Sequence, residues 1–266
     1  MDIQDLGELS GDVLLFGGPY SNLQASEALI AQARDRCIPA DRVICTGDVV
    51  AYGADPVSTL GAFRDFGAPV VAGNCEKQLA SGADDCGCGF DENSTCDLLS
   101  RGWYPFAQAR LGEAERAWMG NCPDLIRFTH GGRRYAVIHG GMTDIARFIW
   151  PVSPDQVFAE ERAAIEAVAG PIDAVIAGHC GVAFHRRIGE FDWINAGAIG
   201  LPPHDGRPET RFAILSERGV IFEHLSYDHA AAADAMRAAG LTQGYDAALL
   251  SGVWPSEDVL PPEMRR

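Results

Sequence analysis

The sequence predicts an α/β protein with two packed sheets and helices on their outer faces. In the first half of the 266-residue chain, short apolar runs rich in β-branched residues alternate with segments of helical periodicity. From residue 172 to residue 225, apolar runs instead follow one another across short turns. Alternation with helices predicts parallel strands, whereas short turns predict antiparallel pairs.

Strands and helices are expected to alternate along the first half, over residues 13–17, 22–30, 43–46, 56–66 and 69–72. Ser21 or Asn22 is a suitable N-cap for the first helix, because either side chain can accept a hydrogen bond from a free N–H of the first turn. The resulting βαβαβ order implies parallel pairing with helices on the sheet faces.

The middle of the chain predicts a helical insertion. A polar, glycine-rich loop over 81–93 precedes it, and the helical pattern covers about 94–121 before the sheet resumes at 124. A further helix is expected to open at Ser153-Pro154-Asp155-Gln156, which combines a capping box with proline at the first helical position. Gly170 is expected to end that helix.

The second half is dominated by strands, which are expected over residues 173–177, 182–187, 190–195, 210–215 and 219–224. The turns at Ile188-Gly189 and Glu217-Arg218-Gly219 are short, so the strands that they join should be antiparallel. A helical tail is expected over about 228–266. Because no long linker divides the chain, we expect one domain over residues 1–266.

The charge and the amino-acid composition exclude several classes of function. A net charge of −16 disfavours a nucleic-acid surface, which needs clusters of Lys and Arg, and it also disfavours an anionic membrane surface. The N-terminus lacks the basic and apolar regions of a signal peptide, and no apolar run approaches the roughly 20 residues of a membrane span. Eight cysteines without an export signal indicate reduced thiols, so a cytoplasmic location is expected.

Four expected strands are followed, directly or across a short turn, by a side chain that can bind a metal: Asp48, Asn74, His139 and His179. Ligands of α/β sheets gather beyond the carboxyl ends of the strands. Two imidazoles and two oxygen donors, with positions open for water, suit one Mn, Fe or Zn ion. The alternative is that each side chain only caps its turn by hydrogen bonding. The strand over 13–17 carries no such ligand at its end.

Five segments match, in order and spacing, the motifs of one enzyme family. They cover residues 47–56, 73–76, 139–141, 178–181 and 195–202, which resemble the family's GDxxxxG, GN(H/C)(D/E), isolated histidine, GHxH and NxGSxGxP motifs. On these residues the chain resembles the calcineurin-like metallophosphoesterases, specifically their small bacterial phosphodiesterase branch. The resemblance runs from about residue 11 to residue 250 and implies a four-layer α/β/β/α sandwich.

The resemblance also implies two metal ions about 4 Å apart that share seven ligand positions. Matching residues occupy the bridging position and the three positions of the second metal, in the order Asp48, Asn74, His139 and His179. The positions that belong only to the first metal hold Gly18, Tyr20 and Gly181. This pattern predicts that one site is dismantled and that one divalent transition metal (Mn, Fe or Zn) is kept.

Two further departures concern catalysis. Cys75 stands where the family usually places a histidine that protonates the leaving group, a variant that close relatives also carry. The arginine or polar pair that often follows the last motif is replaced by Ala198 and Pro203. The residues expected to act in catalysis are therefore Asp48, Asn74, His139 and Cys75, with phosphate binding and proton delivery weakened.

Other residues are candidates for the rim of the site. Tyr20 could bind the metal or fill the emptied space, and Cys180 could supply a thiolate or act as a small buried filler. Asn22 and His204 are expected near the pocket. The cluster of Cys86, Cys88 and Cys96 could bind a metal, form a redox pair or consist of thiols without a function.

Two classes of function follow from these residues. The first is a metal-dependent phosphoesterase that acts on a small phosphorylated substrate, a phosphodiester or a phosphomonoester, with low or specialised activity. The second is a catalytically impaired pseudoenzyme that binds a metal or a nucleotide-like ligand on the same scaffold. No nucleic-acid or membrane partner is expected, and the substrate and the oligomeric state stay open.

Overall fold

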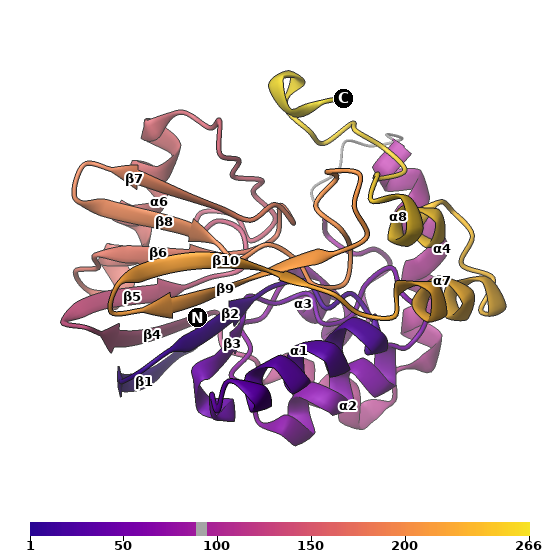
Figure 1. The fold of residues 1–266 in the computed structure, drawn as a ribbon, viewed down its shortest axis with the longest axis horizontal. Helices are drawn as coiled ribbons and strands as arrows, with labels where there is room; N and C mark the ends of the chain where they lie inside the picture. Colours follow the sequence, from indigo (N-terminus) through magenta and orange to yellow (C-terminus); the bar gives the residue numbers. More distant parts are fainter. Residues whose placement is uncertain (89–94) are drawn as a thin grey trace.

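The described residues place ten strands in two sheets (Figure 1). The computed structural model describes residues 1–88 and 95–266, without the side chains of residues 96–98. The six-stranded sheet has the order β1 (Ile3–Leu9), β4 (Leu125–His130), β5 (Arg133–Val137), β6 (Ala174–Ala177), β8 (Phe191–Asn195) and β7 (Phe184–Ile188). The four-stranded sheet has the order β10 (Gly219–Leu225), β9 (Thr210–Ser216), β2 (Val13–Phe16) and β3 (Val43–Cys45).

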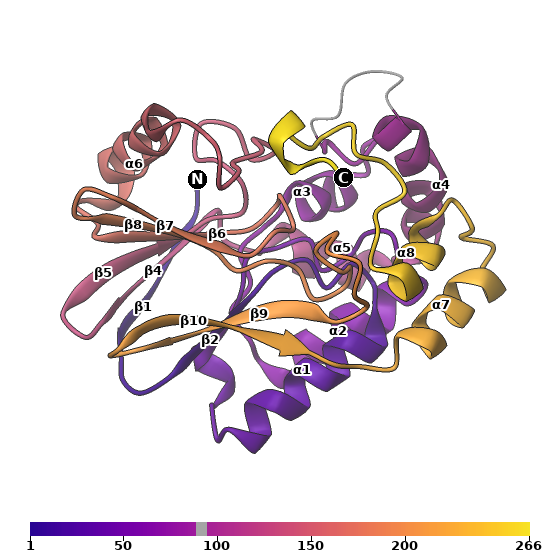
Figure 2. The same ribbon diagram turned by 45° about the horizontal axis from the view of Figure 1, so that its top comes forward.

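Alternate side chains along a strand pack into different layers, as the period of a strand requires. In β2, Val13 and Leu15 pack between the two sheets, whereas Leu14 and Phe16 pack against α1 (Leu23–Asp35) and α2 (Pro56–Phe66). Beyond the six-stranded sheet, α6 (Asp155–Ala169) forms the fourth layer. Figure 2 shows α6 outside one sheet and α1 and α2 outside the other. The predicted α/β/β/α sandwich is therefore confirmed.

The contact between α6 and its sheet depends on Phe158, which is fully buried and meets Trp193 edge to face at a ring separation of 5.3 Å. We predict that Phe158→Ala lowers the free energy of unfolding by about 3–5 kcal/mol, because it leaves a cavity that the sheet cannot close. Urea denaturation measures this change. Val168→Ala on the exposed face of the same helix is the control. A loss below about 1 kcal/mol for Phe158→Ala would contradict the fourth layer.

The predicted strand pairings agree with the structure. β2 and β3 are parallel, and the pairs β7–β8 and β9–β10 are antiparallel. β6 pairs with β8 in parallel and not with β7, which follows it in sequence. The carboxyl ends of β3, β5 and β6 therefore point to the same end of the sandwich, where the candidate ligands follow them.

The remaining α-helices lie at that same end (Figures 1 and 2). They are α3 (Asn74–Ser81), α4 (Thr95–Arg110), α5 (Glu113–Gly120), α7 (His229–Ala238) and α8 (Tyr245–Ser251). α4 and α5 cover the predicted helical insertion, and α7 and α8 begin the predicted tail. Residues 89–94, the end of the predicted glycine-rich loop and the first residue of the insertion, lie outside the described residues.

Three local predictions were wrong. β1 was not expected, because polar residues and a glycine interrupt its apolar ones and only Leu9 of it is buried. The strand expected over 69–72 is reduced to a single bridge between Val70 and Cys45 at the edge of the sheet. The Ser153 side chain does not cap α6, because its hydroxyl accepts a hydrogen bond from the Trp150 N–H at 2.9 Å instead.

Two further observations concern the expected location. Cys86 and Cys88 form a disulfide, so not all of the cysteines are the reduced thiols that were expected. Among the described residues, no helix is both long enough and apolar enough to span a membrane. The cytoplasmic location stays a prediction.

Candidate metal centre

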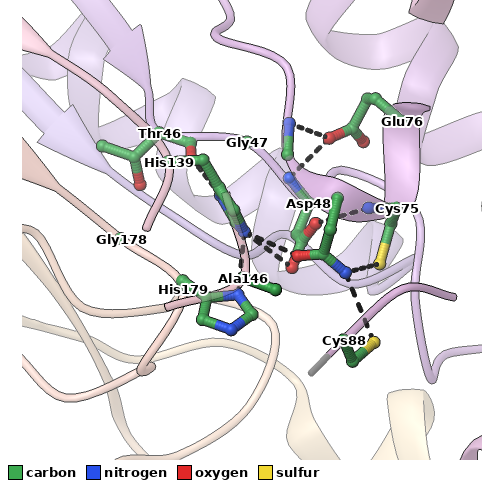
Figure 3. Close-up of polar contacts among 12 residues, drawn as sticks. Thr46, Gly47, Asp48, Cys75, Glu76, Cys88, His139, Ala146, Gly178 and His179 are labelled. Carbon is green, nitrogen blue, oxygen red and sulfur yellow. Dashed lines mark hydrogen bonds and ion pairs between the residues drawn. The ribbon is translucent and has the colours of Figure 1, made fainter. Parts of the chain in front are cut away.

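The four candidate ligands come together at the carboxyl ends of the strands, and Figure 3 labels three of them, Asp48, His139 and His179. Asp48 follows β3, Asn74 opens α3 after the Val70 bridge, and the two histidines follow β5 and β6. The ligand atoms of Asp48, His139 and His179 all lie within 4.8 Å of one another. Atoms of Asp48, Asn74 and His179 converge on one atom, the Nε2 of His139.

The orientation of the His139 ring follows from its contact with Thr46. Nδ1 lies 2.6 Å from the Thr46 carbonyl oxygen, which can only accept, so Nδ1 carries the proton and donates. Nε2 then presents a lone pair to the site. It lies 3.0 Å from Asn74 Oδ1, 3.0 Å from His179 Nδ1 and 3.3 Å from Asp48 Oδ2.

Asn74 is oriented by the loop that contains the disulfide. Its Nδ2 donates to the Cys86 carbonyl oxygen at 2.9 Å and to the sulfurs of Cys88 and Cys75 at 3.3 and 3.5 Å. The amide oxygen must therefore face His139. Asp48 is held in turn, because its Oδ1 accepts from the Cys75 N–H at 3.2 Å.

This arrangement fits a divalent cation. Bonds of about 2.0–2.2 Å from an ion to nitrogen and oxygen place adjacent ligand atoms about 3 Å or slightly more apart. The three neighbours of His139 Nε2 lie at such separations, 3.0–3.3 Å. The Asp48 and His139 side chains are buried, and Nε2 faces two oxygens, Asn74 Oδ1 and Asp48 Oδ2, that have no proton to donate to it. In addition, His179 Nε2 is buried and has no hydrogen-bond partner among the described residues. The donor set of two imidazoles, one carboxylate and one amide oxygen suits Mn, Fe or Zn.

In the metal-free cluster, the pKa shifts show that the neighbouring charged groups offset the effect of burial. Burial alone would raise the pKa of Asp48, but the neighbouring His139 outweighs it and lowers this pKa. Burial likewise acts to lower the pKa of His139, and Asp48 reverses the shift and raises it. The pKa of His179 falls to about 3, through burial and repulsion by His139. Asp48 and His139 therefore each favour the charged form of the other.

Glu76 supports the turn that carries Asp48, a role that the sequence reasoning missed. Its Oε2 accepts from the backbone N–H groups of Asp48 and Gly73, and its Oε1 accepts from that of Val49, all at 2.8 Å. Asp48 has a left-handed backbone with φ of 56°, so the turn needs such support. Gly47 beside it has no room for a Cβ, which would lie 2.7 Å from the Gly73 nitrogen. The signal for Glu76 was its place as the last residue of the 73–76 motif.

Burial and the negative charge of Asp48 raise the pKa of Glu76 to about 7 in the folded protein, against 4.5 without this environment. Its contribution to stability is therefore fully present below pH 4.5 and is lost as the pH rises through about 7. For metal-free protein, we predict that the free energy of unfolding of wild type, relative to that of Glu76→Gln, falls by up to about 3 kcal/mol between pH 4.5 and pH 8. Urea denaturation at both values measures it, and a constant difference would contradict the assignment.

A cavity of about 60 Å³ opens beside the cluster, enough for an ion and several water molecules. Asp48, His179 and Cys180 line it, and its walls include the aromatic side chains of Tyr20, Tyr52, Phe148, Tyr245 and Trp254. Neither Lys nor Arg occurs among the described lining residues. The Phe148 ring lies over His179 at 4.3 Å between centroids. Apart from Tyr20, sequence reasoning did not assign these aromatic residues to the site.

Of the four residues expected at the rim of the site, Tyr20 and Cys180 line the cavity, whereas Asn22 and His204 do not. Asn22 caps α1 through a hydrogen bond from the Ala25 N–H at 3.1 Å and donates to the Gly200 carbonyl oxygen. His204 accepts from the Trp254 N–H at 2.8 Å, so it holds a wall residue without reaching the cavity.

Cys75 is also absent from the cavity lining. Its thiol is buried and lies against the Asn74 amide, and burial together with the negative Asp48 raises its pKa well above the usual range. Burial raises the pKa of the Cys180 thiol to about 12. Both cysteines are therefore neutral thiols in the metal-free protein.

Of the three positions that lack metal ligands, Gly18 and Gly181 lie on either side of the aromatic ring of the third, Tyr20. A Cβ at Gly18 would lie 2.3 Å from Cζ of Tyr20, and a Cβ at Gly181 would lie 3.9 Å from the Tyr20 hydroxyl oxygen. The ring therefore fills the space between the two glycines. A side chain at position 18 could not coexist with Tyr20 in this orientation.

Comparisons with known proteins agree with the fold. A crystal structure of a metallophosphoesterase from Sphaerobacter thermophilus matches with a TM-score of 0.70 and 22% identity, over 92% of this chain and 100% of that one. A hypothetical protein from Pyrococcus horikoshii OT3 matches with a TM-score of 0.75 and 15% identity, over 91% and 98% of the two chains. Among curated proteins, the comparison found no match.

The family match identifies the class to which this fold and donor set belong, the metal-dependent phosphoesterases. The family model of the calcineurin-like phosphoesterase superfamily domain matches residues 20–219. The chain belongs to the calcineurin-like phosphoesterase superfamily.

Proposed function

We propose that this protein is a mononuclear metallophosphoesterase that hydrolyses a small phosphorylated substrate with low or specialised activity. Asp48, Asn74, His139 and His179 hold one divalent cation. The observation that carries the proposal is the convergence of three ligand atoms within 3.3 Å of His139 Nε2, while the Tyr20 ring fills the space between Gly18 and Gly181.

A bound divalent cation would polarise a phosphoryl oxygen and lower the pKa of a water molecule. The chain itself supplies the orientation. Thr46 sets the proton of His139 on Nδ1, and Glu76 and the Cys75 N–H hold Asp48 in place. The buried Cys75 thiol does not reach the cavity, so the leaving group receives no proton from it. Substrates with leaving groups that need no protonation are therefore favoured.

The second candidate is a pseudoenzyme that binds a metal or a nucleotide-like ligand without cleaving it. The observation that favours it is the cavity lining, in which the described residues include neither Lys nor Arg to neutralise a transferred phosphoryl group. Aromatic walls of this kind suit binding as well as turnover.

Hydrolysis of bis(4-nitrophenyl) phosphate by chelator-treated and metal-reloaded protein distinguishes the two candidates. The proposed enzyme releases nitrophenolate only after reloading with Mn, Fe or Zn, and 4-nitrophenyl phosphate provides the monoester comparison. Tight binding of the metal without turnover on either ester would favour the pseudoenzyme. Turnover that does not depend on the metal would indicate a contaminant and would contradict the proposal.

A further inference from the structure

The hydroxyl of Tyr20 is a hydrogen-bond donor without a partner among the described residues. The side chain lines the cavity next to Asp48 and His179, and the residue is only 6% exposed. The hydroxyl group points into this cavity and not into a contact with another described side chain. The residue is mostly buried while the hydroxyl stays open to the cavity, so a ligand in the cavity can accept a hydrogen bond from it in a poorly solvated environment, where such bonds are strong.

The position of Tyr20 is firmly set. Its backbone N–H donates to the Asp48 carbonyl oxygen at 3.2 Å, and its φ of 52° lies in the left-handed region. Its ring meets Tyr52 edge to face at 4.9 Å and leaves no space for a side chain at Gly18. The hydroxyl is thus held beside the metal centre before any ligand arrives, as effective stabilisation of a charged group requires.

The charge of the cavity limits the ligand that this donor can serve. The described lining residues contain one carboxylate, that of Asp48, together with neutral aromatic and small side chains. A phosphomonoester carries a charge of about −1.5 to −2 at pH 7, whereas a phosphodiester carries only one negative charge. With a single cation and neither Lys nor Arg among the described lining residues, the singly charged group has the smaller desolvation penalty.

We propose that Tyr20 contacts the substrate, that its hydroxyl donates to a non-bridging oxygen of the phosphoryl group, and that the cavity thereby selects singly charged phosphodiesters over phosphomonoesters. The proposal rests on the proposed function, because it places the phosphoryl group beside the metal centre. In this proposal, the phenol hydroxyl stabilises the phosphoryl oxygen that a second cation would otherwise bind.

The test is a calorimetric titration of Mn-loaded protein at pH 8 with phenylphosphonate and with its monomethyl ester, which differ in charge by one unit and are not cleaved during the titration. The variants are Tyr20→Phe and, as a matched control, Tyr104→Phe. Tyr104 is also buried, but its hydroxyl donates to the Ala83 carbonyl oxygen at 3.0 Å and does not line the cavity. The metal content and thermal unfolding of each variant are measured in parallel.

We expect wild type to bind the singly charged ester at least about tenfold more tightly than the dianion. Tyr20→Phe should weaken binding of the ester by about 10- to 100-fold, the range expected for a hydrogen bond to a charged group, with its metal retained. Tyr104→Phe should bind like wild type. Preference for the dianion, binding of neither phosphonate, or Tyr20→Phe binding within twofold of wild type would overturn the proposal.

The same proteins separate this inference from the proposed function. Loss of phosphonate binding in Tyr20→Phe, together with no metal-dependent turnover by wild type, would support the inference and reject the enzyme. Turnover by wild type, together with unchanged binding and hydrolysis in Tyr20→Phe, would reject the inference and leave the enzyme.

Discussion

Replacing His139 by Ala should lower the affinity for a divalent cation by at least about 100-fold. Loss of a residue that only orients a metal ligand already lowers metal affinity by about 10- to 100-fold, and loss of the ligand itself should cost at least as much. The reason is geometric, since the ligand atoms of Asn74, His179 and Asp48 all lie within 3.3 Å of the nitrogen that the substitution removes. Elemental mass spectrometry after dialysis against a fixed metal concentration measures the loss.

The control for this substitution is His185→Ala on β7. His185 is paired with Asp192 at 2.7 Å and lies outside the cavity lining and the ligand cluster. It tests whether the removal of any histidine lowers the metal content. Equal metal content in His139→Ala and wild type would exclude His139 as a ligand.

The second large effect is expected for Asp48→Asn, which should reduce metal-dependent hydrolysis by about 10³-fold, or about 4 kcal/mol in the activation free energy. Asn tolerates the left-handed backbone that Asp48 adopts, so the turn should survive. What is lost is the negative charge, which both offsets the charge of a cation and holds the pKa of His139 above its usual value.

Steady-state rates with bis(4-nitrophenyl) phosphate measure this loss, and Asp173→Asn is the matched control. Asp173 is paired with Arg134 on the surface at 2.8 Å, far in the fold from the ligand cluster. Its substitution should leave the rate unchanged. A rate for Asp48→Asn within tenfold of wild type would mean that the carboxylate takes no part in hydrolysis.

Most of the fold could be predicted because the strands of the core are short apolar runs with clear ends. The sandwich needs Val13 and Leu15 on one face of β2 and Leu14 and Phe16 on the other, so a continuous apolar run is its direct signature. β1 could not be found in this way, because it lies at an edge and buries little. Its pairing with β4 depends on backbone hydrogen bonds, which leave no pattern in the sequence.

The candidate ligands could be predicted from the residues that follow the strands, because the sheet itself brings those ends together. The walls of the cavity could not. Phe148, Tyr245 and Trp254 come from distant loops and from the C-terminal tail, and only the packing of these segments on the sandwich places them near His179. Asn22 and His204 looked equally suitable by sequence, but their polar atoms are used in a helix cap and in a contact with Trp254.

The central claim is that the chain holds one cation and not two. The number of ions per chain in purified protein, reloaded with Mn, Fe or Zn and measured by elemental mass spectrometry, tests it directly. The donor cluster around His139 and the Tyr20 ring between Gly18 and Gly181 predict one ion per chain. Two ions per chain would show that Tyr20 does not close the first site, and none after reloading would show that the converging side chains are not ligands.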